Sequence, residues 1–274
     1  MKKQNHEKKI NNIFESNVTG NSKTNKNSND KTTRNDNDNP GEDSKLLECE
    51  PREKKKYVYY KFDNYSQKHD LVGFFKYNDC NEFVGIKKLV ELLYNYDKTD
   101  FTLILHISSP GGSAPEFEEA YDKLMELRDK NIKIIGIVDD VCASGGYLLA
   151  MACNEIYCTE NSQIGSIGVY STTVNAKTLA DKIGVTQVIF KTSETKGGIQ
   201  PLMEITDEQT KNMNDTVEYV FANFKNIITK SRPHVNIHEV ANAKVFYGID
   251  AKNLGLVDDI ISVNKYDNND PDKK

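Results

Sequence analysis

The sequence lacks any apolar run of the ~18–20 residues that a membrane-spanning helix needs, and it lacks the apolar core of a signal peptide. It also lacks an excess of positive charge, because 36 Lys and Arg stand against 41 Asp and Glu, for a net charge of −5. Proteins that bind phosphate backbones rely on clustered Lys and Arg, so nucleic-acid binding is not expected. We expect a cytoplasmic protein without a membrane span.

Cysteine is also scarce, with five residues scattered through 274. An odd number of cysteines without a secretory signal argues against a disulfide framework and for a reducing compartment. Cys153 and Cys158 have neither the spacing nor a nearby histidine that a zinc site needs. We therefore expect no metal and no other cofactor.

The two ends of the chain differ from its middle in composition. Residues 1–56 consist mainly of Asn, Lys, Ser, Thr and Asp, and they have too few apolar side chains to offset an ordering entropy of about 1–2 kcal/mol per residue. Acidic residues among them argue against a transit peptide. We predict a disordered polar tail over 1–56, one folded domain over 57–266 and a flexible tail over 267–274.

Strand and helix patterns alternate within the folded region. Short apolar runs at Phe101–Ile107 and Ile132–Val138 are typical of buried parallel strands. Between them, Glu116–Arg128 has the apolar spacing of a helix. Further strands are predicted at 57–60, 71–75, around Val169 and at 185–190, and further helices at 84–96 and from near Ser144 to Cys153. This alternation predicts an α/β fold with a largely parallel sheet.

The clearest helix begins after Thr206. Gln209 follows three residues later, which is the spacing of a capping box, and an apolar stripe then runs from Met213 to Ile228. Pro233 follows the end of this stripe.

Three loops of small residues are candidates for chemistry: 108–113 and 142–147, which each follow a predicted buried strand, and 165–168. Adjacent glycines in the first two loops let backbone N–H groups approach a ligand. Ser144, at a predicted strand-to-helix junction, is a candidate nucleophile. Tight turns and a helix N-cap serine are the alternatives, and the residues alone leave them open.

A serine nucleophile needs a base. None of the five histidines lies in a small-residue loop after a strand, whereas Lys191 and Lys196 lie in the loop that follows the predicted strand 185–190. A lysine can serve as the base if burial favours its neutral amine. The sequence pattern does not choose between these two lysines.

The order and spacing of these motifs resemble the S49 family of serine peptidases, which includes signal peptide peptidase A and the SohB-type proteases. The similarity covers about residues 101–261. The matching motifs are Ser109-Pro110-Gly111-Gly112, Ala143-Ser144-Gly145-Gly146-Tyr147, Gly165-Ser166-Ile167-Gly168-Val169, Gly248-Ile249-Asp250-Ala251 and Leu254-Gly255-Leu256-Val257-Asp258.

The resemblance implies a fold like that of the Clp protease and crotonase group, built from repeated β-β-α units. It also implies a Ser–Lys dyad that hydrolyses peptide bonds, with Ser144 as the nucleophile and Lys196 as the base. The backbone N–H groups of Gly112 and Gly145 match the oxyanion hole, and Ser166 matches a serine that orients the lysine. A histidine about 25 residues after the serine, as in the Clp type, is absent here.

The resemblance further implies a homo-oligomer in which neighbouring subunits can share an active site. Relatives carry an N-terminal membrane anchor where this chain has a polar segment, so soluble peptides or unfolded proteins are the expected substrates. Cys142 is a rival nucleophile, although a buried structural thiol is the expected role.

Two other functions stay open from the sequence. One is a non-catalytic peptide-binding or scaffold ring. It is favoured by Ser193 and Thr195, which replace a glycine and a tyrosine of the family's lysine loop. The other is an acyl-CoA enzyme of the crotonase group, which would need no activated serine.

Overall fold

The computed structural model describes residues 57–63, 72–77, 80–94, 101–193 and 196–261. The predicted tails over 1–56 and 267–274 lie outside these ranges, so their disorder stays a prediction. No helix within the described ranges is both long and apolar enough to cross a bilayer.

Within the described residues, a seven-stranded sheet forms the centre of the molecule, in the order β10-β7-β5-β4-β1-β2-β3. The strands from β10 to β1 pair in parallel, whereas β2 pairs antiparallel with both β1 and β3. Their bounds are β1 Tyr57–Asp63, β2 Val72–Tyr77, β3 Cys80–Gly85, β4 Thr102–Ser108, β5 Lys133–Val138, β7 Glu155–Cys158 and β10 Asp259–Ile260. This arrangement confirms the predicted α/β class with a largely parallel sheet.

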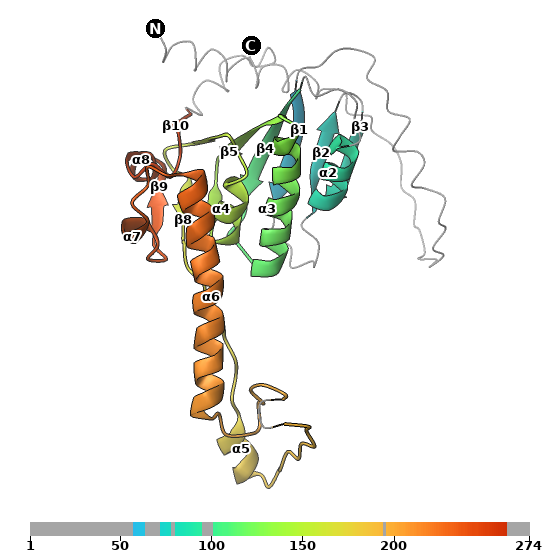
Figure 1. Cartoon of the computed structure of the whole chain (residues 1–274), viewed down its shortest axis with the longest axis vertical. Coiled ribbons are helices and arrows are strands. Elements are labelled where there is room, and N and C mark those ends of the chain that lie inside the picture. Colours follow the sequence, from blue (N-terminus) through green and yellow to red (C-terminus); the bar gives the residue numbers. More distant parts are fainter. Residues whose placement is uncertain (1–56, 64–71, 78–79, 95–100, 194–195, 262–274) are drawn as a thin grey trace, which may run out of the picture.

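Three helices cover one face of this sheet: α2 (Ile86–Tyr94), α3 (Ala114–Asp129) and α4 (Gly145–Ala150) (Figure 1). Leu105 of β4 and Phe117 of α3 are both fully buried in the core on that side. Side chains of the opposite face form a second cluster, made of Ile104, Ile135, Ile137 and Tyr157. Since β4 buries side chains on both faces, its sequence is an almost unbroken apolar run rather than an alternating one.

A second sheet of three strands extends from the carboxyl end of the first. It contains β6 (Val141–Ala143), β8 (Gln163–Gly165) and β9 (Val245–Tyr247), with β6 and β8 parallel and β9 antiparallel to β8. A single bridge between Ser109 and Cys142 joins this sheet to the end of β4. The three small-residue loops thereby meet in one region.

The long helix α6 (Asp207–Ser231) confirms the predicted capping box, in which the Thr206 hydroxyl accepts from the Gln209 N–H and the Gln209 side chain accepts from the Thr206 N–H. Beyond it come α7 (Ile237–Val240) and α8 (Gly248–Asn253). Arg232, at the end of α6, donates two hydrogen bonds of 2.8 and 2.7 Å to the Asp258 carboxylate. This bidentate pair ties the end of α6 to the sheet, because Asp258 also accepts from the Ile156 N–H of β7 at 2.7 Å.

Residues 170–193 and 196–220 project from the compact part of the molecule, and we call them the arm (Figure 1). The arm contains α5 (Lys177–Lys182) and the first half of α6, and the remaining described residues are called the body. Among the described arm residues only Ala180 is buried.

Two predicted strands are wrong. Residues 185–190 lie in the arm without regular structure, and β8 ends at Gly165, before Val169. In the arm no neighbouring strand offers a hydrogen-bond partner within the described residues, so apolar side chains there stay exposed instead of joining a sheet. Phe190 is 95% exposed and Val188 is 70% exposed.

Candidate active site

Ser144 lies at the junction between β6 and α4, where the chain turns sharply from strand to helix. Its backbone has φ 52° and ψ −122°, which a non-glycine residue rarely adopts. The junction is held by a hydrogen bond of 2.8 Å from the Ser144 N–H to the Gly165 carbonyl. Ser144 is half-buried. A serine on a strained strand-to-helix turn is typical of hydrolases that use the serine hydroxyl as a nucleophile.

The loop after β4 packs directly against Ser144. Gly111 has φ +102°, and a Cβ atom built on it would lie 2.6 Å from the Cβ of Ser144 and 3.0 Å from its Oγ. Only glycine fits at such a distance, so the approach of this loop to the candidate nucleophile explains the glycine at position 111. Gly112, the next residue, is exposed, and its N–H is a candidate oxyanion donor.

Glycines also open the start of α4. A Cβ on Gly145 would lie 2.6 Å from the ring of Phe117, and a Cβ on Gly146 would lie 2.7 Å from the Ser109 carbonyl oxygen. The Gly145 N–H is the first amide of the helix, where no intrahelical acceptor exists. Of the two predicted oxyanion donors, Gly112 therefore belongs to the loop that packs against Ser144, and Gly145 directly follows Ser144 at the start of α4.

The third loop, residues 165–168, lies next to Ser144, because its first residue, Gly165, accepts the hydrogen bond from the Ser144 N–H. Ser166 is half-buried, has φ 49°, and donates its N–H to the Lys244 carbonyl at 2.7 Å. Ala243 has φ 60° and donates its N–H to the Ile167 carbonyl at 3.1 Å. Three non-glycine residues with positive φ, Ser144, Ser166 and Ala243, thus lie in hydrogen-bonded segments around one site. Strained backbone of this kind is often found at active sites.

The segment 243–244 is a part of this site that sequence reasoning missed. It joins the site through backbone hydrogen bonds, which leave no signature in residue types. The one hint is Gly168, on which a Cβ would lie 2.9 Å from the Cβ of Ala243.

The structure does not bring Lys196 to Ser144 of the same chain. Lys196 is exposed and lies in the arm, in a loop fixed to the start of α6 by a 2.7 Å hydrogen bond from the Gln209 side chain to the Gly198 carbonyl. Phe221 is the first α6 side chain that packs against the core, so about 21 Å of helix, at 1.5 Å per residue, separates this loop from the body. Lys191, the other candidate base, is also an exposed arm residue.

Cys142 has the environment of a structural thiol. It is fully buried in β6, and its Sγ donates to the Gly146 carbonyl at 3.3 Å. Burial raises the pKa of this thiol well above its usual value, which disfavours the nucleophilic thiolate. The prediction that Cys142 is structural is confirmed. In the described part of the chain, no three His, Cys, Asp or Glu side chains are grouped to hold a metal ion.

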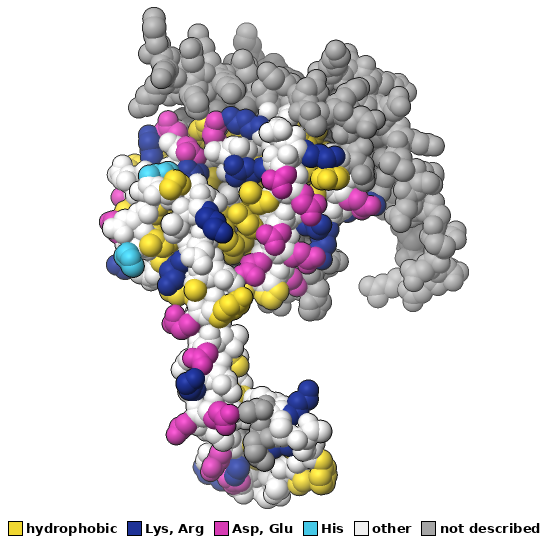
Figure 2. Space-filling view, viewed as in Figure 1, with side chains coloured by type: hydrophobic (Ala, Val, Ile, Leu, Met, Phe, Trp, Pro, Cys, Tyr) yellow, Lys and Arg dark blue, Asp and Glu magenta, His cyan; other side chains and the backbone are white. Residues whose placement is uncertain are grey.

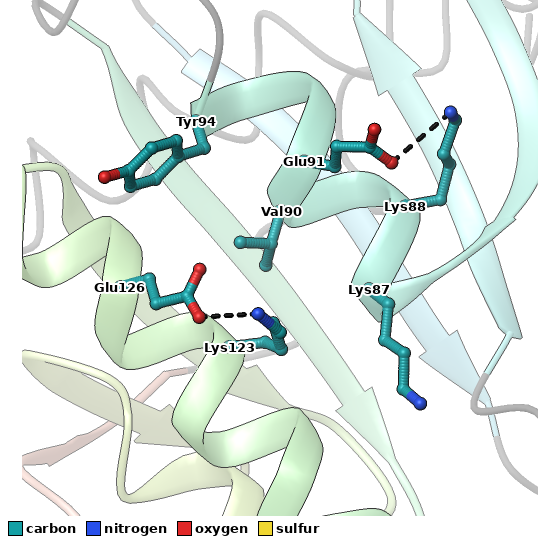
Figure 3. Close-up of a pocket in the computed structure, with 7 residues that line it drawn as sticks. All are labelled: Lys87, Lys88, Val90, Glu91, Tyr94, Lys123 and Glu126. Atoms are coloured by element: carbon teal, nitrogen blue, oxygen red, sulfur yellow. Dashed lines mark hydrogen bonds and ion pairs between the residues drawn. The ribbon is translucent and has the colours of Figure 1, made fainter.

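Two hollows lie away from Ser144. One, of about 410 Å³, is on the arm beside the Lys196 loop, and its lining includes Lys191, Gly198 and Gln209. The other, of about 460 Å³, lies between α2 and α3 (Figure 3). Its lysines are paired with carboxylates, Lys88 with Glu91 at 3.4 Å and Lys123 with Glu126 at 2.6 Å. A groove whose charges compensate one another offers no evident selectivity for a charged ligand.

Comparison with known proteins places these features in one family. The family model described as peptidase family S49 matches residues 126–269. A protein of Enterococcus faecium named as a signal peptide peptidase, SppA, is 29% identical over 68% of this chain and 53% of its own length. A protein of Haemophilus influenzae named as a protease, SohB, is 29% identical over 66% of this chain and 51% of its own. A protein of Synechocystis named as a protease is 30% identical over 57% of each chain. The chain thus spans about half the length of these relatives.

Proposed function

Because this chain belongs to the S49 family of peptidases, we propose that it is a serine endopeptidase that cleaves peptides or unfolded proteins with Ser144 and Lys196. The observation that carries the proposal is the strained junction at Ser144, where Gly111 packs too closely against Ser144 for any side chain and Gly145 too closely against Phe117. A mere turn or helix cap would not need three converging segments of small residues.

The proposed reaction begins when the Ser144 Oγ attacks a peptide carbonyl carbon. The hydroxyl proton passes to the neutral amine of Lys196, which then protonates the leaving nitrogen. The N–H groups of Gly112 and Gly145 stabilise the oxyanion, each by about 3–4 kcal/mol. Water then hydrolyses the acyl-enzyme with Lys196 as the base, and the Ser166 hydroxyl orients the amine.

We further propose that the Lys196 of one subunit serves the Ser144 of a neighbour. In a single chain these residues are separated by the exposed half of α6 (Figure 1). A lysine acts as a base when burial favours its neutral form, and docking of an arm onto a neighbouring body would provide that burial. The exposed apolar side chains at the far end of the arm support such docking (Figure 2).

The function is tested with the full-length protein and fluorescein-labelled casein. Ser144→Ala should abolish cleavage, on the order of a 10³-fold loss or more, because the attacking atom is removed. Thr229→Ala is the control for loss of a hydroxyl, since Thr229 is exposed on the body half of α6 and lies in none of the three loops. Cleavage that survives in Ser144→Ala would refute the proposal.

A fluorophosphonate probe separates the peptidase from a non-catalytic ring. The wild type should be labelled at Ser144, and Lys196→Ala should be labelled far more slowly because its serine lacks a base. An unlabelled wild type would favour a scaffold or a crotonase-type enzyme, neither of which needs an activated serine.

A further inference from the structure

We infer that Ser109 is a positioning residue, which holds the loop of the proposed oxyanion hole against Ser144. This inference rests on the proposed peptidase function. Ser109 directly follows β4 and has no exposed surface, so its hydroxyl cannot reach a substrate. It can act only through the residues that it contacts.

The side chain of Ser109 fixes the turn of the loop. Its Oγ accepts a hydrogen bond from the Gly111 N–H at 3.2 Å. Gly111 has φ +102°, and glycine enters this region and leaves it again at little steric cost. The hydrogen bond to Ser109 therefore restrains the backbone of Gly111, which glycine stereochemistry leaves free to change conformation. The Gly112 N–H lies in the peptide plane between Gly111 and Gly112. The backbone conformation of Gly111 therefore sets the direction of this N–H.

The backbone of Ser109 is tied to the strand that delivers the nucleophile. Its N–H donates to the Val141 carbonyl at 2.8 Å, and its carbonyl accepts from the Ala143 N–H at 2.9 Å. Both partners belong to β6, which ends directly before Ser144. Ser109 thus joins the loop with one proposed oxyanion donor to the strand that carries the proposed nucleophile.

Close packing makes this link rigid. A Cβ on Gly146 would lie 2.9 Å from the Cβ of Ser109 and 3.1 Å from its Oγ. Because Ser109 is lodged directly against α4, the Gly111 amide has a fixed acceptor. Oxyanion donors accelerate a reaction only when they are preorganised at the position of the developing charge. Loss of the Ser109 hydroxyl should therefore weaken transition-state stabilisation and leave ground-state binding unchanged.

The test compares Ser109→Ala with Thr229→Ala in the full-length assembled protein. Casein cleavage gives kcat and KM, and fluorophosphonate labelling gives the rate and the final stoichiometry at Ser144. We expect Ser109→Ala to lower kcat and the labelling rate roughly 3- to 10-fold, the effect of one hydrogen bond, with KM unchanged. Thr229→Ala, which removes an exposed hydroxyl outside the three loops, should match the wild type.

A folding defect gives a different pattern. It would lower the final stoichiometry of labelling but not the rate at the sites that remain. Ser109→Cys keeps the packing against Gly146 and offers only a weak sulfur acceptor, so its labelling rate should lie between those of the wild type and Ser109→Ala.

Wild-type kcat and labelling rates in both Ser109 variants would overturn the inference, and so would a change confined to KM. If the wild type itself is not labelled, the proposed function fails, which is distinct from failure of the role of Ser109.

Discussion

The body and the arm treat apolar side chains in opposite ways. The body buries them on both faces of its main sheet, whereas the arm exposes Tyr170 at 87%, Val174 at 78% and Phe190 at 95%. An apolar side chain that is exposed to water adds no stability to the chain, whereas the burial of one large apolar side chain contributes about 1.5–3 kcal/mol. Among the described residues, apolar side chains thus collect in the core of the body and stay on the surface of the arm, which fits the contact with a neighbouring subunit proposed above.

Local interactions hold the arm in shape without a core. The capping box at Thr206 starts α6, and ion pairs one helical turn apart link Lys177 to Asp181 and Lys211 to Asp215. Such interactions stabilise a helix by tenths of a kcal/mol each. The proposed base, Lys196, therefore lies in a segment that has defined local structure but few tertiary contacts.

The largest expected effect in this comparison comes from the exposed end of the arm. Phe190→Asp should dissociate the assembly and lower casein cleavage at least about tenfold, because a charge would be buried in the proposed contact. The monomer's thermal stability should not change, since Phe190 contacts little within its own chain. Sedimentation velocity and casein cleavage measure the two effects.

Ile249→Asp is the control for that variant, because Ile249 is a 53% exposed apolar residue of the body. It should keep both assembly and activity. An intact assembly in Phe190→Asp would contradict the proposed role of the arm.

A smaller effect is expected from the ion pair that joins α6 to the body. Arg232→Ala should lower the free energy of unfolding by about 3 kcal/mol, since it leaves the Asp258 carboxylate without its bidentate partner. Lys211→Ala, which breaks an exposed pair in the arm, should leave urea denaturation unchanged. Equal losses in the two variants would refute the contrast between body and arm.

The smallest effect is expected from alkylation of Cys142, a buried residue of the body. Burial raises the pKa of its thiol, so it should stay unalkylated by iodoacetamide in the native protein at pH 8. It should react once the protein is denatured in urea. Rapid alkylation in the native state, detected by mass spectrometry, would show that the core around β6 is open.

The sequence predicted the buried strands of the body and the capping box of α6, but not the irregular structure of residues 185–190 in the arm. Residues 101–107 and 132–138 were recognised as strands because buried parallel strands are apolar on both faces, and β4 and β5 lie there. Residues 185–190 have the same apolar character, yet they form no strand. Local pattern cannot distinguish an apolar side chain that packs in a core from one that stays exposed within its own chain.

The candidate site was predictable in part for the same reason. The glycines at 111, 145 and 146 are forced by close approach, so they mark Ser144 in the sequence. The contribution of Ala243 depends on a long-range backbone hydrogen bond and has no such mark. The distance between Lys196 and Ser144 depends on the direction of α6, which no local motif encodes.

Mixing of inactive subunits tests the proposal that two chains complete one active site. Ser144→Ala and Lys196→Ala proteins, each inactive alone, are mixed in equal amounts after confirmed subunit exchange. If each site takes its serine and its lysine from different chains, random assembly should restore about one quarter of the wild-type casein cleavage. No recovery after verified exchange would contradict the account.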